Sequence, residues 1–362
     1  MTVVLFVFII AVLVFIHELG HFLAAKIFGV RVDEFGLGFP PRAAAFRLGE
    51  TEYSLNFIPF GGFVKIFGET PDAETETGPD RDRSMTAKAK WKQAVILLAG
   101  VSANWLLAWL LISAGLMSGL PMAVGENNDL PLSDIRTAIL QVSPDSPAER
   151  AGLAAGDVVT YIASGRNNVN RPDVERFQQV IQRAPDIITI GYERGEKKSQ
   201  VSLTPEEGFS AEGKAIGVSL GEIGTLKLAP YEALKRGFTH TWQMTKMIFS
   251  GLGDMVEALW AGENIKDSVM GPVGIAGLVG DARSLGWIYV LTFAAFISLD
   301  LAVINLLPFP ALDGGRLFFL AIETIKGSPI RPKVANTLNV IGFLFLVGLM
   351  LVVTVFDVWR LF

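Results

Sequence analysis

The chain has 362 residues, of which 51% are hydrophobic, and its formal net charge is only −5. This composition excludes an ordinary soluble protein, and the mild negative charge argues against nucleic acid as a partner. The chain has no cysteine, so disulfide bonds and thiolate metal sites are excluded as well. Any metal ion would have to be held by histidine and carboxylate side chains.

Long apolar runs predict four membrane-spanning helices, because a helix needs about 20 apolar residues to cross a bilayer. We expect these helices over residues 1–27, 93–120, 286–315 and 337–358. A cleavable signal peptide is a poor alternative for the first run, since residues 1–16 contain no basic residue. The expected fold class is therefore a polytopic α-helical membrane protein with one polar domain between its second and third spans.

The first apolar run ends in His17-Glu18-Leu19-Gly20-His21. Residues four apart lie on one face of a helix, so both imidazoles can reach a single metal ion. This H-E-x-x-H spacing is typical of zinc proteases, in which the glutamate takes a proton from the metal-activated water. The motif therefore predicts peptide hydrolysis inside a membrane, with one Zn²⁺ as the cofactor and Glu18 as the catalytic residue.

Residues 28–92 are expected to form a loop that contains a β-hairpin. Residues 43–48 and 52–58 have a strand pattern and flank a Gly49-Glu50-Thr51 turn. Residues 58–63 continue the second strand and are too apolar for a free loop, so we expect a membrane-associated hairpin. A hydrophobic loop packed on the protein surface is the alternative.

Two further segments differ from the spans in composition. Residues 68–89 are polar and charged, which is typical of a flexible linker. Residues 230–284 contain an amphipathic helical stretch with Trp242 and Trp260, residues that suit a membrane interface. We expect this stretch to lie on the membrane surface.

Residues 128–222 have the composition of a soluble domain. Their sequence S-P-A-E-R-A-G-L-A-A-G-D at residues 146–157 resembles that of a bacterial PDZ domain. Such a domain binds an extended peptide as an added strand at a sheet edge, and Ile216, Gly217 and Val218 are the expected edge residues. A domain that binds no peptide and acts as a steric gate remains equally open.

Two histidines do not complete a catalytic zinc site, which normally has three protein ligands and an open position for water. The only other histidine, His240, is expected on the opposite side of the membrane. Asp313 is the best-placed carboxylate, because it follows the end of the third apolar run. Two prolines precede it, which should end the helix, and the following glycine pair permits a close backbone approach.

Lysine and arginine residues predict the orientation of the chain. They gather before the second span and between the third and fourth, at Lys88, Lys90, Lys92, Arg316, Lys326, Arg331 and Lys333. We therefore expect the hairpin loop and a loop over residues 316–336 in the cytoplasm. The PDZ-like domain and both termini would lie in the periplasm of a Gram-negative cell, with the spans in its inner membrane and the active site toward the cytoplasm.

The motif H-E-x-G-H on one span and N-x-x-P-x-P-x-L-D-G on a later one resembles the paired signature of site-2 intramembrane metalloproteases of the RseP type. The resemblance implies that His17, His21 and Asp313 bind zinc and that Asn305 helps to hold the substrate backbone. It also implies that residues 58–65 are a membrane-embedded β-segment, where we expect the substrate to pair. The remaining substrate-binding candidates are Gly61, Gly62, Phe63 and Asp300.

Asp300 stands where the resemblance leads us to expect an asparagine. It could contact substrate, interact with Asn305, or be a buried protonated acid, and the sequence does not decide among these roles.

The function expected from this resemblance is regulated intramembrane proteolysis in a stress response. The substrates would be single-span membrane proteins, with an anti-sigma factor and remnant signal peptides as the two candidates. The alternative is a PDZ-bearing membrane scaffold or chaperone without catalytic activity. The intact Glu18 argues against that alternative, because an inactive relative would be expected to lose this residue first.

Overall fold

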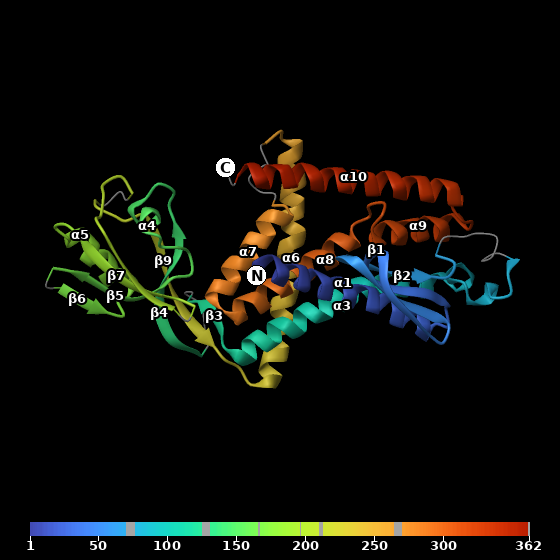
Figure 1. Cartoon of the computed structure of the whole chain (residues 1–362), viewed down its shortest axis with the longest axis horizontal. Coiled ribbons are helices and arrows are strands. Elements are labelled where there is room, and N and C mark those ends of the chain that lie inside the picture. Colours follow the sequence, from blue (N-terminus) through green and yellow to red (C-terminus); the bar gives the residue numbers. More distant parts are fainter. Residues whose placement is uncertain are drawn as a thin grey trace. The chain divides into compact units, whose positions relative to one another are not determined.

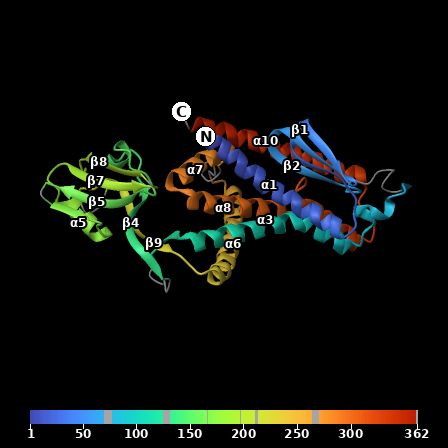
Figure 2. The same cartoon turned by 60° about the horizontal axis from the view of Figure 1, so that its bottom comes forward.

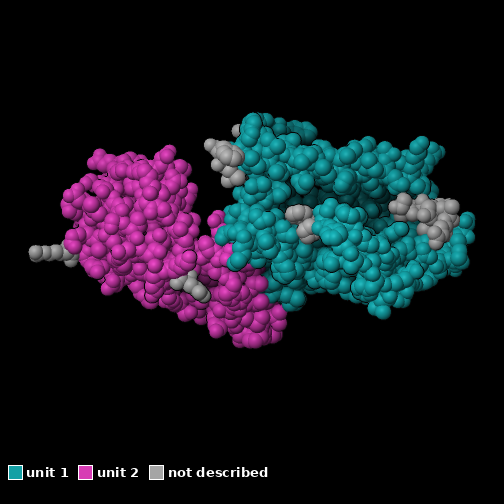
Figure 3. Space-filling view, viewed as in Figure 1, with its two compact units in different colours: residues 1–112, 236–280, 292–362 teal, residues 113–235, 281–291 magenta. Residues whose placement is uncertain are grey.

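The computed structural model describes residues 1–69, 77–124, 131–165, 167–195, 197–209, 213–263 and 270–360. The chain divides into two compact units (Figure 3). One comprises residues 1–112, 236–280 and 292–362, and the other comprises residues 113–235 and 281–291.

Within the described ranges, four helices are long and apolar enough to cross a membrane: α1 (Thr2–Ile27), α3 (Lys90–Ser118), α8 (Trp287–Leu306) and α10 (Pro332–Trp359). They correspond to the four runs expected from the sequence. In α10 only 6% of the most apolar window is buried, so most of its apolar surface is not covered by protein. This is the composition of a helix that is solvated by lipid rather than by water.

The hairpin consists of β1 (Val32–Leu48) and β2 (Thr51–Ile66), which lie against α1 (Figures 1 and 2). Both strands are longer than the expected segments and the sheet is strongly bent. Phe35 is paired with both Val64 and Tyr53, so residues 34–37 lie between two segments of β2. This arrangement leaves residues 62–66 at the outside of the sheet.

Helix α1, helix α3 and the hairpin share one apolar core. Its members are Ala24, Ala25, Val30, Val32, Ile66, Met85, Ile96, Leu97 and Leu320. Met85 comes from residues 68–89, where the sequence predicts a flexible linker. Instead, residues 81–83 and 85–87 form two short 3-10 helices, and the Met85 N–H donates to the Phe67 carbonyl. The linker expectation is wrong for this part because Met85 is buried; residues 70–76 lie outside the described residues.

Helix α8 ends at Leu306, shortly before the two prolines that were expected to end the helix. The loop after it differs from expectation. A new helix, α9 (Asp313–Lys326), occupies much of the expected loop at residues 316–336. Leu320 anchors α9 in the apolar core, and Gly327 ends the helix in a left-handed conformation.

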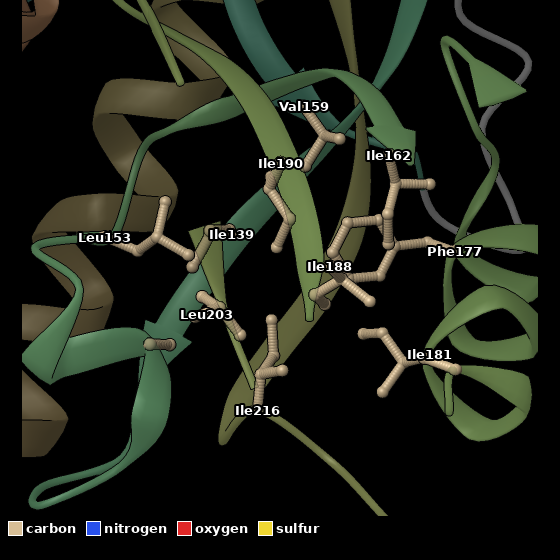
Figure 4. Close-up of a cluster of buried hydrophobic side chains, with 12 residues drawn as sticks. Ile139, Leu153, Val159, Ile162, Phe177, Ile181, Ile188, Ile190, Leu203 and Ile216 are labelled. Atoms are coloured by element: carbon tan, nitrogen blue, oxygen red, sulfur yellow. The ribbon is translucent and has the colours of Figure 1, made fainter. Parts of the chain in front are cut away.

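The second unit contains a sheet in the order β3-β9-β4-β5-β7-β8, with β6 paired to β5. The strands are β3 (Leu120–Ala123), β4 (Leu132–Val142), β5 (Val158–Ser164), β6 (Asn167–Asn170), β7 (Ile188–Arg194), β8 (Lys197–Leu203) and β9 (Val218–Leu226). Figure 4 shows the isoleucine-rich core beside the sheet, which includes Phe177 and Ile216.

Two helices accompany this sheet, α4 (Pro147–Arg150) and α5 (Val174–Arg183). Ser146 and Asp173 cap them through their side-chain oxygens, which accept the N–H groups of Glu149 and Arg176. The expected amphipathic stretch at 230–284 consists of α6 (Pro230–Trp260) and α7 (Pro272–Leu285).

Candidate metal centre

Three side chains that are distant in the sequence converge in the first unit. The distance from Asp313 Oδ2 to His17 Nε2 is 3.0 Å and to His21 Nε2 is 3.1 Å, and the two Nε2 atoms are 3.2 Å apart. Ligand atoms around a tetrahedral zinc ion at about 2.0–2.1 Å are separated by roughly 3.4 Å. The two nitrogens and one oxygen therefore fit around one zinc ion with little adjustment, and this donor set needs no cysteine.

Helix α1 supplies both imidazoles because His17 and His21 are one turn apart. Their side chains are buried, with only 8% and 6% of the two residues exposed. His21 Nδ1 lies 2.8 Å from the carbonyl oxygen of Ile96 in α3. If the Nδ1–H donates to this oxygen, the Nε2 lone pair is directed toward a metal.

Helix α3 approaches the motif at Ala99 and Gly100. A Cβ atom built on Gly100 would lie 2.3 Å from His21 Nε2, and one on Gly20 would lie 2.4 Å from the Ala99 carbonyl oxygen. Neither distance is possible for real atoms. The two glycines therefore permit the contact between α1 and α3 at which His21 is held.

Asp313 is positioned by the non-helical connection between α8 and α9. Within it, Ala311 has a positive φ of 75°, and its N–H donates to Asn339 Oδ1 in α10 at 3.2 Å. Cβ atoms on Gly314 and Gly315 would lie within 2.3 Å of backbone carbonyl oxygens in this connection. The tight turn therefore needs both glycines, as their place after Asp313 suggests.

Asn339 was not identified from the sequence. The available signal was a polar amide within a predicted span, a position where such groups usually have a partner inside the protein.

Glu18 belongs to α1, and its side chain lies beside the outer segment of β2, residues 62–66. Its Cγ would be 3.5 Å from a Cβ on Gly62, which lies in this outer segment. Glu18 is thus beside the histidines and also beside the edge of the hairpin. A carboxylate in this position can exchange a proton with a water molecule at the metal centre.

The three hairpin residues that were expected to bind substrate, Gly61, Gly62 and Phe63, have different surroundings at this edge. Gly62 is the one next to Glu18, whereas Gly61 has a φ of 93° and faces the ring of Phe39. The Phe63 ring covers Gly36, where a Cβ would lie 2.5 Å from it.

Helix α8 carries two further residues that were expected to bind substrate, Asn305 and Asp300. In the described part of the chain, no hydrogen bond or ion pair connects Asn305 or Asp300 to His17, His21 or Asp313. Both residues are half-buried. Their expected substrate contacts stay predictions.

Ile216, Gly217 and Val218 lie in the second unit. The Ile216 side chain is only 1% exposed and belongs to the core in Figure 4, so it cannot contact a bound peptide directly. The carbonyl groups of Ile216 and Gly217 accept the N–H groups of Ala148 and Ser143. Val218 begins β9, which pairs with β4 and also contacts α5.

The chain is similar to known proteases along almost its whole length. The family model of Peptidase family M50 matches residues 5–349. A Clostridium perfringens protein whose name describes a zinc metalloprotease is 35% identical over 96% of this chain and 95% of that protein. Zinc metalloprotease RasP of Geobacillus kaustophilus is 29% identical over 100% of this chain and 98% of RasP. Regulator of sigma-W protease RasP of Bacillus subtilis is 30% identical, over 100% and 99% of the two chains.

Proposed function

Because the chain belongs to peptidase family M50, the family of site-2 proteases, we propose that it is a zinc endopeptidase that cleaves transmembrane segments of other proteins. The observation that carries this proposal is the convergence of His17, His21 and Asp313 at 3.0–3.2 Å, with Glu18 beside them. Two of these ligands lie on α1, a helix apolar enough to span a membrane in a multi-pass membrane protein. We assign one zinc ion to these three ligands.

The chemistry divides between the metal and Glu18. Bound zinc polarises the scissile carbonyl and lowers the pKa of a bound water to about 7. Glu18 takes the proton from the attacking water and returns it to the leaving amine. The buried imidazoles and Asp313 hold their positions through Ile96, Asn339 and the glycine contacts described above.

A substrate helix must unwind before it can be cleaved, because its carbonyl groups are occupied by hydrogen bonds within the helix. In lipid, each exposed backbone group costs several kcal/mol. We infer that residues 61–63 and their neighbours in β2 offset this cost by pairing with the unwound substrate as an added strand. The proximity of Glu18 to Gly62 supports this inference, because Gly62 belongs to the outer segment of β2, which pairs with β1 on one side only in the described sheet.

We propose a PDZ domain for the polar region at residues 128–222. Its support is the sequence S-P-A-E-R-A-G-L-A-A-G-D together with a sheet whose strand β9 contacts helix α5. A peptide could add to β9 only over residues 218–221, since β4 pairs with one edge of this strand and β3 pairs with residues 223–226 at the other. Gating of substrate entry without peptide binding is the second role consistent with this domain.

We propose single-span membrane proteins as the substrate class. The Bacillus subtilis relative is named as a regulator of sigma-W protease, which supports an anti-sigma factor as one substrate of this chain. Remnant signal peptides are the second candidate. From the Lys and Arg distribution, the site faces the cytoplasm and the PDZ domain faces the periplasm across the inner membrane.

The test uses the full chain purified in detergent and a single-span substrate. We expect one zinc ion per chain, and Glu18→Gln should keep the zinc while cleavage falls by about 10²–10⁴-fold. Glu257→Gln is the matched control, since it makes the same change at an exposed position of α6. Undiminished cleavage by Glu18→Gln, or cleavage that survives complete zinc removal, would contradict the proposal.

A further inference from the structure

Asn104 is a fully buried amide in α3 that has no part in the chemistry described above. Its Nδ2 lies 3.5 Å from His17 Nδ1, and its exposed fraction is 0%. On the other side, Ser298 Oγ of α8 donates to the backbone carbonyl of Asn104 at 2.8 Å. Asn104 is therefore held between the helix that carries the zinc motif and the helix that leads to Asp313.

The two histidines of the motif need the same kind of support. A neutral imidazole that binds a metal through Nε2 carries its proton on Nδ1, and this N–H requires an acceptor that fixes the ring. For His21 the acceptor is the Ile96 carbonyl oxygen at 2.8 Å. For His17 the group that faces Nδ1 is the side-chain amide of Asn104.

The orientation of the Asn104 amide is decided by its unsatisfied oxygen. Oδ1 is buried and has no hydrogen-bond partner in the described structure, whereas Nδ2 faces the histidine nitrogen. Nitrogen and oxygen of an amide have nearly the same shape, so the assignment follows from the hydrogen-bond network. A half-turn of the amide brings Oδ1 to His17 Nδ1, where it accepts the proton that a metal-binding imidazole must carry there.

We propose that Asn104 is a positioning residue for the metal centre, whose Oδ1 accepts from His17 Nδ1–H and directs His17 Nε2 toward zinc. This inference rests on the proposed function, because it assumes that His17 binds zinc. It pairs each imidazole with a carbonyl-type oxygen of α3, namely Asn104 Oδ1 for His17 and Ile96 O for His21. Helix α3, which contributes no metal ligand, thus sets the orientation of both.

A role in helix packing is the competing explanation, since buried amides also join helices in membranes. Three variants of the full chain separate the two roles. Asn104→Leu keeps the size of the side chain and removes the acceptor, whereas Asn104→Asp keeps an acceptor oxygen. Ser298→Ala is the control, because it weakens the contact between α3 and α8 without changing the side chain that faces His17.

The measurement is zinc affinity by titration of chelator-stripped protein in detergent, together with the visible spectrum of the Co²⁺-substituted protein. We expect Asn104→Leu to bind zinc about 10–100-fold more weakly, as for other residues that orient metal ligands. Asn104→Asp should restore the affinity to near the wild-type value, and Ser298→Ala should leave it unchanged. The Co²⁺ spectrum should change only in Asn104→Leu.

The zinc-free proteins provide a second readout. We expect stripped Asn104→Leu to unfold at the same temperature as stripped wild type, because the proposed hydrogen bond serves the metal-bound state. An equal loss of zinc affinity in Asn104→Leu and Asn104→Asp would overturn the proposal, as would wild-type affinity and spectrum in Asn104→Leu. If wild type itself binds no zinc, the proposed function fails instead, so the two failures are distinguishable.

Discussion

Gly100 and His21 are in such close contact that a single added carbon atom would occupy the place of the imidazole: a Cβ at position 100 would lie 2.3 Å from His21 Nε2. The metal centre therefore depends on a residue that has no side chain. The relationship also explains why α3, which carries none of the proposed ligands, must pack closely on α1 beside His21. Its backbone supplies the Ile96 carbonyl to the same ring.

Gly100→Ala should displace the His21 ring, because the added methyl group would overlap it. The displacement should disturb the contacts of the ring with Ile96 and Asp313. We expect zinc affinity to fall at least about 10-fold, as when a ligand-orienting group is lost. Overpacking should also lower stability by about 1–3 kcal/mol. Zinc titration and thermal unfolding in detergent measure both effects.

Gly115→Ala provides the control for this prediction. It makes the same change in the same helix, but a Cβ there would lie at an ordinary contact distance of 3.7 Å from Leu120. This variant should bind zinc like the wild type. Equal behaviour of the two variants would show that the contact between Gly100 and His21 does not limit the site.

Asn339→Leu should loosen the turn that presents Asp313. The Asn339 side chain accepts the Ala311 N–H at 3.2 Å, and the loss of one such bond costs about 1 kcal/mol or more when the donor is left unsatisfied. We expect a lower cleavage rate and weaker zinc binding, with Asn339→Asp close to wild type because it retains an acceptor. Asn336→Leu, on an exposed position of the same helix, should have no effect on either quantity.

Ala311 adopts a left-handed backbone conformation with a φ of 75°. This conformation costs a residue with a Cβ about 1–2 kcal/mol, and glycine avoids that cost. Ala311→Gly should therefore raise the unfolding temperature or leave it unchanged, whereas the β-branched variant Ala311→Val should lower it. A lower unfolding temperature for Ala311→Gly than for Ala311→Val would contradict this reading of the turn.

The sequence predicted the membrane helices well because their signal is strong and local: about 20 apolar residues with few charges. The proximity of Asp313 to the motif could also be anticipated, since zinc needs a third ligand and no third histidine was available on that side. The role of Asp313 as a ligand stays a prediction. Its geometry, however, depends on a turn that needs Gly314 and Gly315.

Other features could not be read from one sequence because they depend on contacts between distant segments. Nothing near Asn339 indicates that its partner is Ala311, and nothing near Met85 indicates that it enters the core between α1 and α3. Polar composition predicted a flexible linker, but the buried Met85 and backbone hydrogen bonds to Phe67 and from Arg31 order its end. Helix α9 was missed because its charged residues matched the expected topology of a loop.

Glu50, at the hairpin turn, should make stability depend on pH. Hydrogen bonds from Lys26 and Arg83 hold the pKa of the Glu50 carboxyl below its usual range. Since the folded-state pKa is lower than the unfolded one, the stabilisation is present above the unfolded pKa of about 4.3. It is lost as the pH falls through the lower folded-state pKa.

We therefore expect the wild type to lose more unfolding temperature than Glu50→Gln when the pH is lowered from 7 to 3. The corresponding difference in the free energy of unfolding should be at most about 1 kcal/mol, because these ion pairs are partly exposed. Salt should reduce it further. An identical pH dependence in both proteins would show that the hairpin turn is not held by this carboxylate.

Asp357, near the end of α10, caps the start of α7. Its two carboxylate oxygens accept the N–H groups of Gly271 and Gly274 at 3.1 and 2.8 Å, and the residue is only 5% exposed. A carboxylate suits this position because the N-terminus of a helix presents free N–H groups and a partial positive charge. Asp357→Ala should lower stability by about 1–3 kcal/mol, since it leaves buried donors unsatisfied.

Asp357→Asn should lose less stability than Asp357→Ala, because its amide keeps one of the two acceptor oxygens. Asp254→Ala in α6 is the control, since it removes an exposed carboxylate that makes no such cap. Thermal unfolding of the three variants at pH 7, with zinc content measured in parallel, tests the prediction. Because Asp357 contacts none of the three proposed ligands, the zinc content of Asp357→Ala should stay at the wild-type value while its stability falls. A loss of zinc from Asp357→Ala at unchanged stability would assign this carboxylate to the metal centre instead.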